Sequence, residues 1–205
     1  MVLTKQQLQI FRALIEYPWN ELTRKQIKEI SKEKSNNMLS NAIESFKTNN
    51  LINERTIANT KLYSLNFSNE LVYSYISIAN FENLEQEVKI SLNILEECIN
   101  TPFYSIILFG SRTQNEHTSD SDLDVAIITQ KKPDTRTAEL KAPLKLDIHT
   151  INQKEMQQML KAKEENLGKQ IARTHLALVN PGIFYKIILD TNGFSIQDLS
   201  KEVGK

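Results

Sequence analysis

Hydrophobic residues in the first 50 positions recur at helical spacing and predict three helices. The first stripe covers residues 3–15, with Thr4 as the expected N-cap, and stops before Pro18, which ends the helix. Thr23 is the N-cap expected for a second, short helix, because Gln26 three residues later completes a capping box. Ser35 is the N-cap expected for the third helix, whose outer face is polar.

Two short stretches of strand character, residues 51–57 and 61–66, follow the third helix. The segment between them contains Asn59, a residue type that tolerates the left-handed conformation of a tight turn. Three helices followed by a β-hairpin are similar in order to a winged helix-turn-helix domain. The resemblance covers about the first third of the chain.

The rest of the chain mixes helical and strand patterns. Two helical stripes come first, with Asn80 expected at the break between them. Apolar runs of strand length then occupy residues 104–109, 122–129 and 144–151. Asn152 is expected to cap the helix that follows the third run. The predicted fold class is therefore α+β.

We expect two domains, since 205 residues suffice for two small hydrophobic cores. The first is the winged domain at residues 1–67. The second covers residues 68–205, with its core at about 81–163 and a helical C-terminal tail that ends in a short helix near Ile196.

The composition is that of an ordinary globular protein, with 40% hydrophobic and 24% charged residues. Basic and acidic residues number 25 each over the whole chain. The first 67 residues carry ten basic and six acidic ones, which places +4 there and leaves −4 on the remainder. A net positive N-terminal domain is compatible with contact to nucleic acid.

Cysteine and apolar content indicate a cytoplasmic protein. The single cysteine, Cys98, excludes an internal disulfide and any site built from several cysteines, as suits a reducing compartment. No apolar run approaches the roughly 20 residues that a membrane span needs. The N-terminus lacks the apolar core of a signal peptide, so we expect no membrane contact.

A Gly-Ser corner follows the apolar run at residues 104–109. Gly110 allows close approach of the backbone to a ligand, and Ser111 adds a hydroxyl beside backbone N–H groups. Arg112 adds a permanent positive charge suited to phosphate oxygens. These three residues predict a phosphate-binding corner.

Carboxylates gather on the strands that come next. Strand side chains alternate between faces, so Asp122 and Asp124 point the same way. Asp147 and His149 share one face of the following strand. If the two strands are neighbours, three aspartates form one cluster that can hold two Mg²⁺ ions. Two ions about 4 Å apart assist in-line displacement at phosphorus.

Gly110-Ser111, a ten-residue gap, Asp122-Leu123-Asp124 and the later Asp147 together resemble the minimal nucleotidyltransferase domain of the DNA polymerase β superfamily. The resemblance implies a mixed β-sheet flanked by helices, and an NTP with Mg²⁺ as the substrate. It further implies nucleotidyl transfer with release of pyrophosphate, with ATP as the default nucleotide.

The resemblance also assigns roles to individual residues. Gly110 and Ser111 would bind the triphosphate. Asp122 and Asp124 would ligate both metal ions, and Asp147 would ligate the ion that activates the acceptor. RNA ends, small molecules and protein hydroxyls are all acceptors in this superfamily, so the acceptor stays open.

In the winged domain, the third helix is the expected recognition helix. Its asparagines would reach base edges, while basic side chains on this helix and the hairpin would reach phosphates. The candidate nucleic-acid-binding residues are Asn36, Asn37, Asn41, Lys47, Arg55 and Lys61.

The sequence supports two further functions beside the enzyme. One is a DNA-binding transcriptional regulator whose transferase domain senses nucleotide or is inactive. The other is a protein-interaction module in which the winged domain forms a homodimer or docks a partner. A complete set of three carboxylates favours the enzyme over the sensor, because a sensor needs fewer metal ligands.

Overall fold

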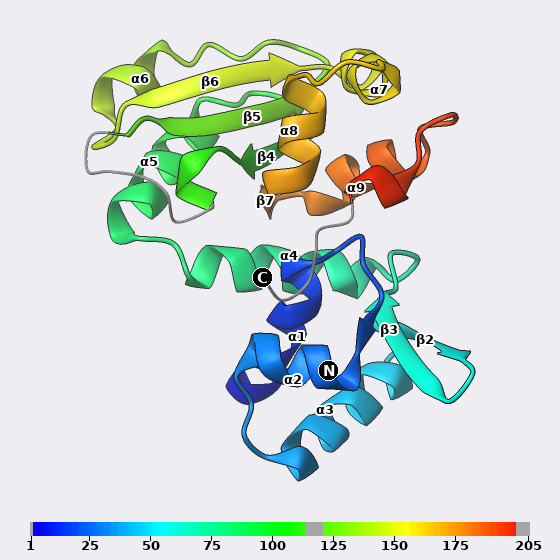
Figure 1. Ribbon diagram of the computed structural model, residues 1–205. Helices are drawn as coiled ribbons and strands as arrows, with labels where there is room; N and C mark the ends of the chain where they lie inside the picture. Colours follow the sequence, from blue (N-terminus) through cyan, green and yellow to red (C-terminus); the bar gives the residue numbers. More distant parts are fainter. Residues whose placement is uncertain (1, 114–120, 200–205) are drawn as a thin grey trace. The chain divides into compact units, whose positions relative to one another are not determined.

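A computed structural model describes residues 2–113 and 121–199 of the chain (Figure 1). These residues form two compact units. The first unit contains residues up to 79 together with 195–199, and the second contains residues 80–194. The division after residue 79 falls inside a helix, twelve residues beyond the boundary expected from the sequence.

The first unit has three N-terminal helices, a small sheet and a fourth helix that continues into the second unit. Its elements are α1 (Lys5–Glu16), β1 (Leu22–Thr23), α2 (Arg24–Ser31), α3 (Asn36–Thr48), β2 (Ile52–Ile57), β3 (Thr60–Leu65), α4 (Glu70–Glu82) and the 3-10 turn η2 (Ile196–Leu199). The sheet is antiparallel in the order β1-β3-β2. The β1 strand was not predicted, because it is only two residues long.

The predicted N-caps of the first three helices are confirmed. The side chains of Thr4, Thr23 and Ser35 each accept a hydrogen bond from the backbone N–H three residues later. The N-caps of α1 and α2 are completed to capping boxes by glutamines. Local sequence therefore determines where these helices begin.

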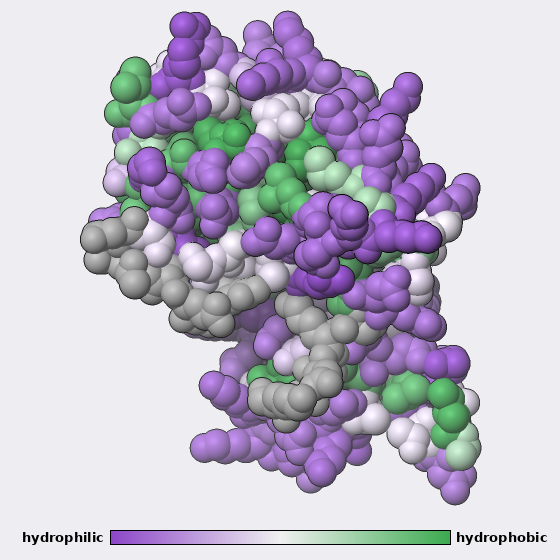
Figure 2. Space-filling view, turned by 45° about the horizontal axis from the view of Figure 1, so that its top comes forward, coloured by the Kyte–Doolittle hydropathy of each residue, from purple (hydrophilic) through white to green (hydrophobic). Residues whose placement is uncertain are grey.

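The hairpin turn differs from its prediction in one residue. Ala58, with φ 51°, takes the left-handed conformation that was expected at Asn59. β2 and β3 pair in register from Ile52 opposite Leu65 to Ile57 opposite Thr60. Ile57, next to the turn of this hairpin, is an exposed large hydrophobic residue. Figure 2 shows hydrophobic surface over the hairpin, at the lower right.

The second unit is built on a four-stranded sheet in the order β6-β5-β4-β7. Its elements are α5 (Gln86–Glu97), β4 (Tyr104–Leu108), the 3-10 turn η1 (Ser111–Thr113), β5 (Leu123–Thr129), α6 (Arg136–Lys141), β6 (Leu146–Ile151), α7 (Gln153–Lys161), α8 (Leu167–Thr174), β7 (Leu176–Val179) and α9 (Pro181–Leu189). β4 is antiparallel to β5 and β7, and β5 is parallel to β6, so the sheet is mixed.

One face of this sheet is covered by α5 and α6. Alternate residues of β5, namely Leu123, Val125 and Ile127, are buried in a core cluster with Leu92 of α5 and Ala138 of α6. The sequence pattern of residues 135–141, the segment that contains α6, fits a helix and an edge strand equally well. As a helix, it provides the crossover that a parallel β5–β6 pair requires. The other face of β5 is therefore the one that carries the aspartates.

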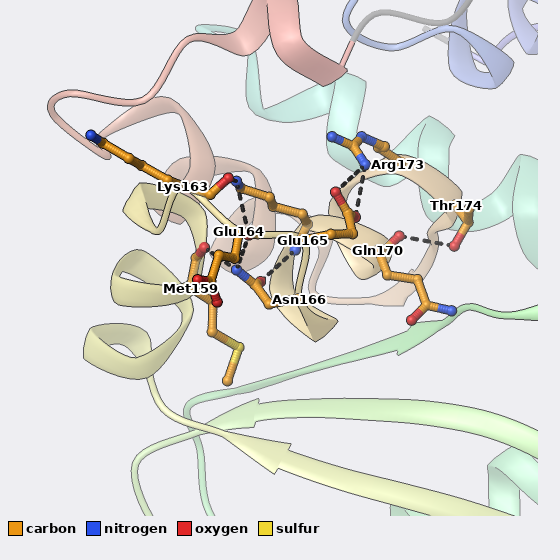
Figure 3. Close-up of polar contacts among 9 residues, drawn as sticks. Met159, Lys163, Glu164, Glu165, Asn166, Gln170, Arg173 and Thr174 are labelled. Carbon is orange, nitrogen blue, oxygen red and sulfur yellow. Dashed lines mark hydrogen bonds and ion pairs between the residues drawn. The ribbon is translucent and has the colours of Figure 1, made fainter.

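The connection between α7 and α8 is held by side chains that hydrogen-bond to the backbone (Figure 3). Asn166 caps α8 through the N–H of Lys169 and donates from its amide to the carbonyl of Met159 at 2.8 Å. Arg173 donates to the carboxylate of Glu165 at 2.8 Å. Gly168 lies directly against Met159, which brings the two helices close together.

The break between the two helices preceding the sheet lies at residues 83–85, and not at Asn80 as predicted. Asn80 lies within α4, is buried, and donates from its side chain to the carbonyl of Ala177 in β7 at 3.0 Å. This tertiary hydrogen bond satisfies the amide inside the helix.

None of the helices in the described residues is both long and apolar enough to cross a bilayer.

Candidate functional site

The predicted corner forms where β4 ends. Gly110 has φ 76°, a left-handed conformation that favours glycine, and η1 begins at Ser111. The N–H and hydroxyl of Thr113 both donate to the carbonyl of Gly110, at 3.2 and 2.7 Å. These bonds close the turn beside the start of β5.

Asp124 packs directly on Gly110. The N–H of Phe109 donates to the carbonyl of Asp124 at 3.1 Å, which aligns the end of β4 with this part of β5. A Cβ atom on Gly110 would lie 2.0 Å from Oδ2 of Asp124. The corner therefore requires glycine for two reasons, its backbone conformation and the space that the carboxylate occupies.

The strands place the three aspartates next to one another. Asp124 of β5 and Asp147 of β6 are register partners across the parallel pair, about 4.8 Å apart along the direction of the strand hydrogen bonds. Asp122 precedes β5 by one residue and is separated from Asp124 by the buried Leu123. The side chains of Asp122 and Asp147 are 36% and 53% exposed. The two strands are neighbours, which is the condition that the sequence set for a cluster of three aspartates.

Within the cluster, the surroundings of Asp124 clearly shift its pKa. Burial raises the pKa of the Asp124 carboxyl, and the like charges of Asp147 and Asp122 raise this pKa further, whereas His149 and Arg112 lower it. Like charges held side by side on one face make the ionised cluster costly on its own. A bound cation would offset this repulsion.

Two of the three carboxylates have basic partners. Nζ of Lys145 lies 2.6 Å from Oδ2 of Asp122, and Nε2 of His149 lies 3.4 Å from Oδ2 of Asp147. The His149 ring also lies 5.7 Å from the Phe109 ring at the corner. The pKa of Lys145 is raised by its hydrogen bond to Asp122, so its ammonium is charged at neutral pH.

Arg112 lies at the corner, but its guanidinium is engaged by the protein. Its side chain is only 5% exposed. Nε and Nη2 donate to the carbonyl of Ser121, at 3.3 and 2.8 Å, and Nη1 lies 3.6 Å from the carboxylate of Glu85, the N-cap residue of α5. Arg112 thereby links the start of η1 to the residue before Asp122.

The donor set fits a hard divalent cation in its chemistry. Carboxylate oxygens on adjacent strands are the ligands that Mg²⁺ prefers. Over residues 2–113 and 121–199, no group of three His, Cys, Asp or Glu side chains lies close enough together to hold a metal ion. The backbones of Asp124 and Asp147 are register partners, and Lys145 pairs with the carboxylate of Asp122.

Sequence reasoning missed Lys145. Its position two residues before Asp147 provides the signal that could have found it, because residues 145, 147 and 149 fall on one face of an extended segment. Glu85, which pairs with Arg112, carried no such signal, since it lies 27 positions earlier in the connection between two helices.

The candidate nucleic-acid contacts of the first unit lie on α3 and the hairpin. Asn36, Asn37 and Asn41 are exposed, and Oδ1 of Asn36 accepts from Nζ of Lys28 at 2.8 Å. The three basic candidates are paired with carboxylates. Lys47 and Lys61 lie 3.2 and 3.0 Å from Glu54, and Arg55 donates to Glu21.

Comparison with known proteins supports the nucleotidyltransferase resemblance of the second unit. Residues 93–181 match the family model described as Polymerase beta, Nucleotidyltransferase. The match extends from α5 to the first residue of α9, so it contains all four strands of the mixed sheet and the three aspartates. Neither a curated protein nor a solved structure matched the chain. On these grounds, residues 93–181 are similar to the nucleotidyltransferase domain of the polymerase beta family.

Proposed function

We propose that the protein is a Mg²⁺-dependent nucleotidyltransferase that moves an NMP, AMP by preference, from an NTP to an acceptor and releases pyrophosphate. The observation that carries this proposal is the register pairing of Asp124 with Asp147 beside the Gly110 corner. The match of residues 93–181 to a nucleotidyltransferase family supports the same chemistry.

The proposed roles follow the geometry of the corner. The N–H groups of Gly110 and Ser111 and the Ser111 hydroxyl bind oxygens of the triphosphate. Asp122, Asp124 and Asp147 hold two Mg²⁺ ions. When bound, these ions supply Lewis acid chemistry at the attacking oxygen, the phosphoryl group and the leaving oxygen.

The transfer itself requires one bond to form and one to break. An oxygen of the acceptor attacks the α-phosphorus, and the bond from that phosphorus to the bridging oxygen of pyrophosphate breaks. The electron pair of the broken bond leaves with pyrophosphate. Asp147, whose side chain is 53% exposed against 36% for Asp122, is available to accept the proton of the acceptor hydroxyl.

A binding and transfer experiment tests the proposal. The full chain is incubated with labelled NTP, Mg²⁺ and RNA or cell lysate, beside Asp124→Asn and the control Asp134→Asn. Asp134 is an exposed aspartate in the connection after β5, away from the corner. The proposal expects label transfer by the parent protein and by Asp134→Asn, with a loss of at least about 100-fold in Asp124→Asn. A parent protein that neither binds Mg-NTP nor transfers label would refute it.

For the first unit, we propose a winged helix that selects or positions the acceptor. The order α1, β1, α2, α3, β2 and β3, with β1 pairing to β3, supports this assignment. The exposed amides of α3 suit contacts to bases. The acceptor on this proposal is a nucleic acid, or a protein bound to this unit.

The alternative function is a DNA-binding regulator in which the second unit binds nucleotide without turnover. A gel-shift titration against salt separates nucleic-acid binding by the first unit from its use as a homodimer module. Phosphate contacts release counterions, so binding to nucleic acid must weaken as salt rises. Salt-independent self-association would instead identify this unit as a homodimer module.

A further inference from the structure

We propose that the Lys145 ammonium contacts the triphosphate of the bound nucleotide. Before a divalent cation binds, this ammonium forms an ion pair with Asp122, and the cation displaces it from that carboxylate. The inference rests on the proposed function and adds a substrate-binding residue to it. On this inference, the Lys145 ammonium and the metal ion compete for the carboxylate of Asp122.

Lys145 stands at the edge of the carboxylate cluster. Its ammonium lies 2.6 Å from Oδ2 of Asp122, and its side chain is 80% exposed. The carbonyl of Lys145 accepts the N–H of Leu123 at 2.8 Å, which fixes its backbone beside the start of β5. A rigid backbone position with an exposed, flexible side chain allows the ammonium to change partners without moving the sheet.

A triphosphate bound at this corner needs positive charge besides the metal, because it approaches three carboxylates. Among the described residues, Arg112 also places a cation at the corner, but its nearly buried guanidinium is bound by Ser121 and Glu85. Contact of Arg112 with phosphate would leave the carbonyl of Ser121 without these donors. Lys145 gives up only an exposed ion pair, which is a weak interaction.

The exchange follows from charge balance. A divalent cation on Asp122 neutralises the carboxylate that holds Lys145, so the ammonium loses its partner when the metal binds. Phosphate oxygens then become the nearest anions that can accept its hydrogen bonds. Metal and nucleotide would therefore bind together more favourably than either alone.

Loss of the Lys145 ammonium is expected to raise the affinity for the metal ion alone and to lower the affinity for the metal-bound NTP. In Lys145→Met, Mn²⁺ alone should bind up to about fivefold more tightly, because its competitor for Asp122 is removed. The affinity for Mn-NTP should fall about tenfold or more, while the affinity for the corresponding NMP should change little, because the charged contact is to the triphosphate.

The experiment uses the full chain with Lys145→Met, Lys145→Arg, Arg112→Lys and the control Lys132→Met. Lys132 is an exposed lysine beyond the other end of β5. Binding of Mn²⁺ alone is followed by electron paramagnetic resonance, and binding of NTP and NMP in Mn²⁺ by calorimetry. Lys145→Arg should keep triphosphate selectivity, and Lys132→Met should match the parent protein.

Each outcome bears on the inference. Tighter Mn²⁺ with a selective loss of NTP in Lys145→Met supports it. Equal losses of NTP and NMP, or values that match Lys132→Met, overturn it while leaving the proposed function standing. A selective loss of NTP in Arg112→Lys, with none in Lys145→Met, would assign the phosphate contact to Arg112. A parent protein that binds neither Mn²⁺ nor NTP would refute the proposed function, and the inference with it.

Discussion

Gly110 is where the proposed site depends most directly on backbone geometry. Its φ of 76° disfavours any other residue, and the closeness of Asp124 leaves no space for a Cβ atom. In Gly110→Ala, the new methyl group must displace the Asp124 carboxylate or the turn itself. We expect a loss of about 1 kcal/mol or more of folding stability from the left-handed backbone. Nucleotide binding should fall more steeply than stability does.

Urea unfolding and Mg-NTP calorimetry on the same samples check this expectation. Gly193→Ala is the matched control, because Gly193 also has a positive φ of 80° but no atom lies within 4 Å of its added Cβ. It should lose stability and keep nucleotide binding. Wild-type nucleotide affinity in Gly110→Ala would contradict the placement of the triphosphate at this corner.

Ionised Asp124 is expected to destabilise the metal-free protein, a cost that its proposed role as a metal ligand explains. Its pKa is raised in the folded protein, mainly by burial and then by Asp147, so the ionised form is the one that folding disfavours. This penalty is absent below the unfolded-state pKa and is complete above the folded-state pKa. The metal-free Asp124→Asn variant should therefore be more stable than the parent at pH 7, and this advantage should disappear as the pH falls below about 4.

Urea titrations with a chelator present, at a series of pH values, measure the effect. Asp134→Asn provides the control with the opposite sign, because Arg136 lowers the pKa of Asp134 to about 2. That ionised carboxylate favours the folded state above its unfolded pKa and loses this effect as the pH falls through about 2. Equal or lower stability of Asp124→Asn at pH 7 would contradict the electrostatic account of the cluster.

At the scale of elements, features with a local cause were predictable. The caps at Thr4, Thr23 and Ser35 depend on residues within three positions, and the alternation along β5 places its aspartates opposite the core. The Asp124–Asp147 pair was predictable only on the condition that their strands are neighbours. That condition depends on the crossover through α6, whose pattern was too short to decide.

Features with a distant cause were not predictable. β7 is four residues long, and its place in the sheet comes from pairing with β4, about 70 positions earlier in the chain. Asn80 reads as a helix breaker, yet it lies inside α4 because Ala177 accepts its amide. The partners of Arg112 likewise come from two separate segments. Local propensity carries no information about such partners.

The α7–α8 corner supports a stability prediction for an element pair. A Cβ on Gly168 would lie 2.5 Å from Cβ of Met159, closer than real contacts allow. Gly168→Ala should therefore push the helices apart and cost about 1–3 kcal/mol in urea unfolding. In the Met159→Ala background, the contact with Cβ remains while the rest of the side chain is gone, so part of the cost should be relieved. A neutral or stabilising Gly168→Ala would contradict this close packing.

On the scale of the whole molecule, we propose that the second unit transfers the nucleotide and that the first unit binds the acceptor. Removing an ion-pair partner from the first unit tests whether it binds nucleic acid. Glu54 holds both Lys47 and Lys61 in ion pairs. If this surface contacts nucleic acid, Glu54→Gln should raise the affinity and make its salt dependence steeper, because two cations become available to phosphates.

Gel shifts at several salt concentrations measure this change. Glu165→Gln is the control, because it removes the same charge from an ion pair with Arg173 in the second unit. An equal gain in both variants would reflect net charge alone. No gain in Glu54→Gln would argue that this surface docks a protein or a second copy of the chain.

Nucleotidyl transfer by the second unit is the central claim, and the position of the label in the product tests it most directly. The full chain is incubated with the same NTP labelled either at the α-phosphate or at the γ-phosphate, with Mg²⁺ and RNA or lysate as acceptor. We expect label on the acceptor from the α-labelled NTP alone, labelled pyrophosphate from the γ-labelled NTP, and neither product with Asp124→Asn or Asp147→Asn. Acceptor labelled from the γ-phosphate, or α-label transfer that survives both substitutions, would contradict nucleotidyl transfer at these carboxylates.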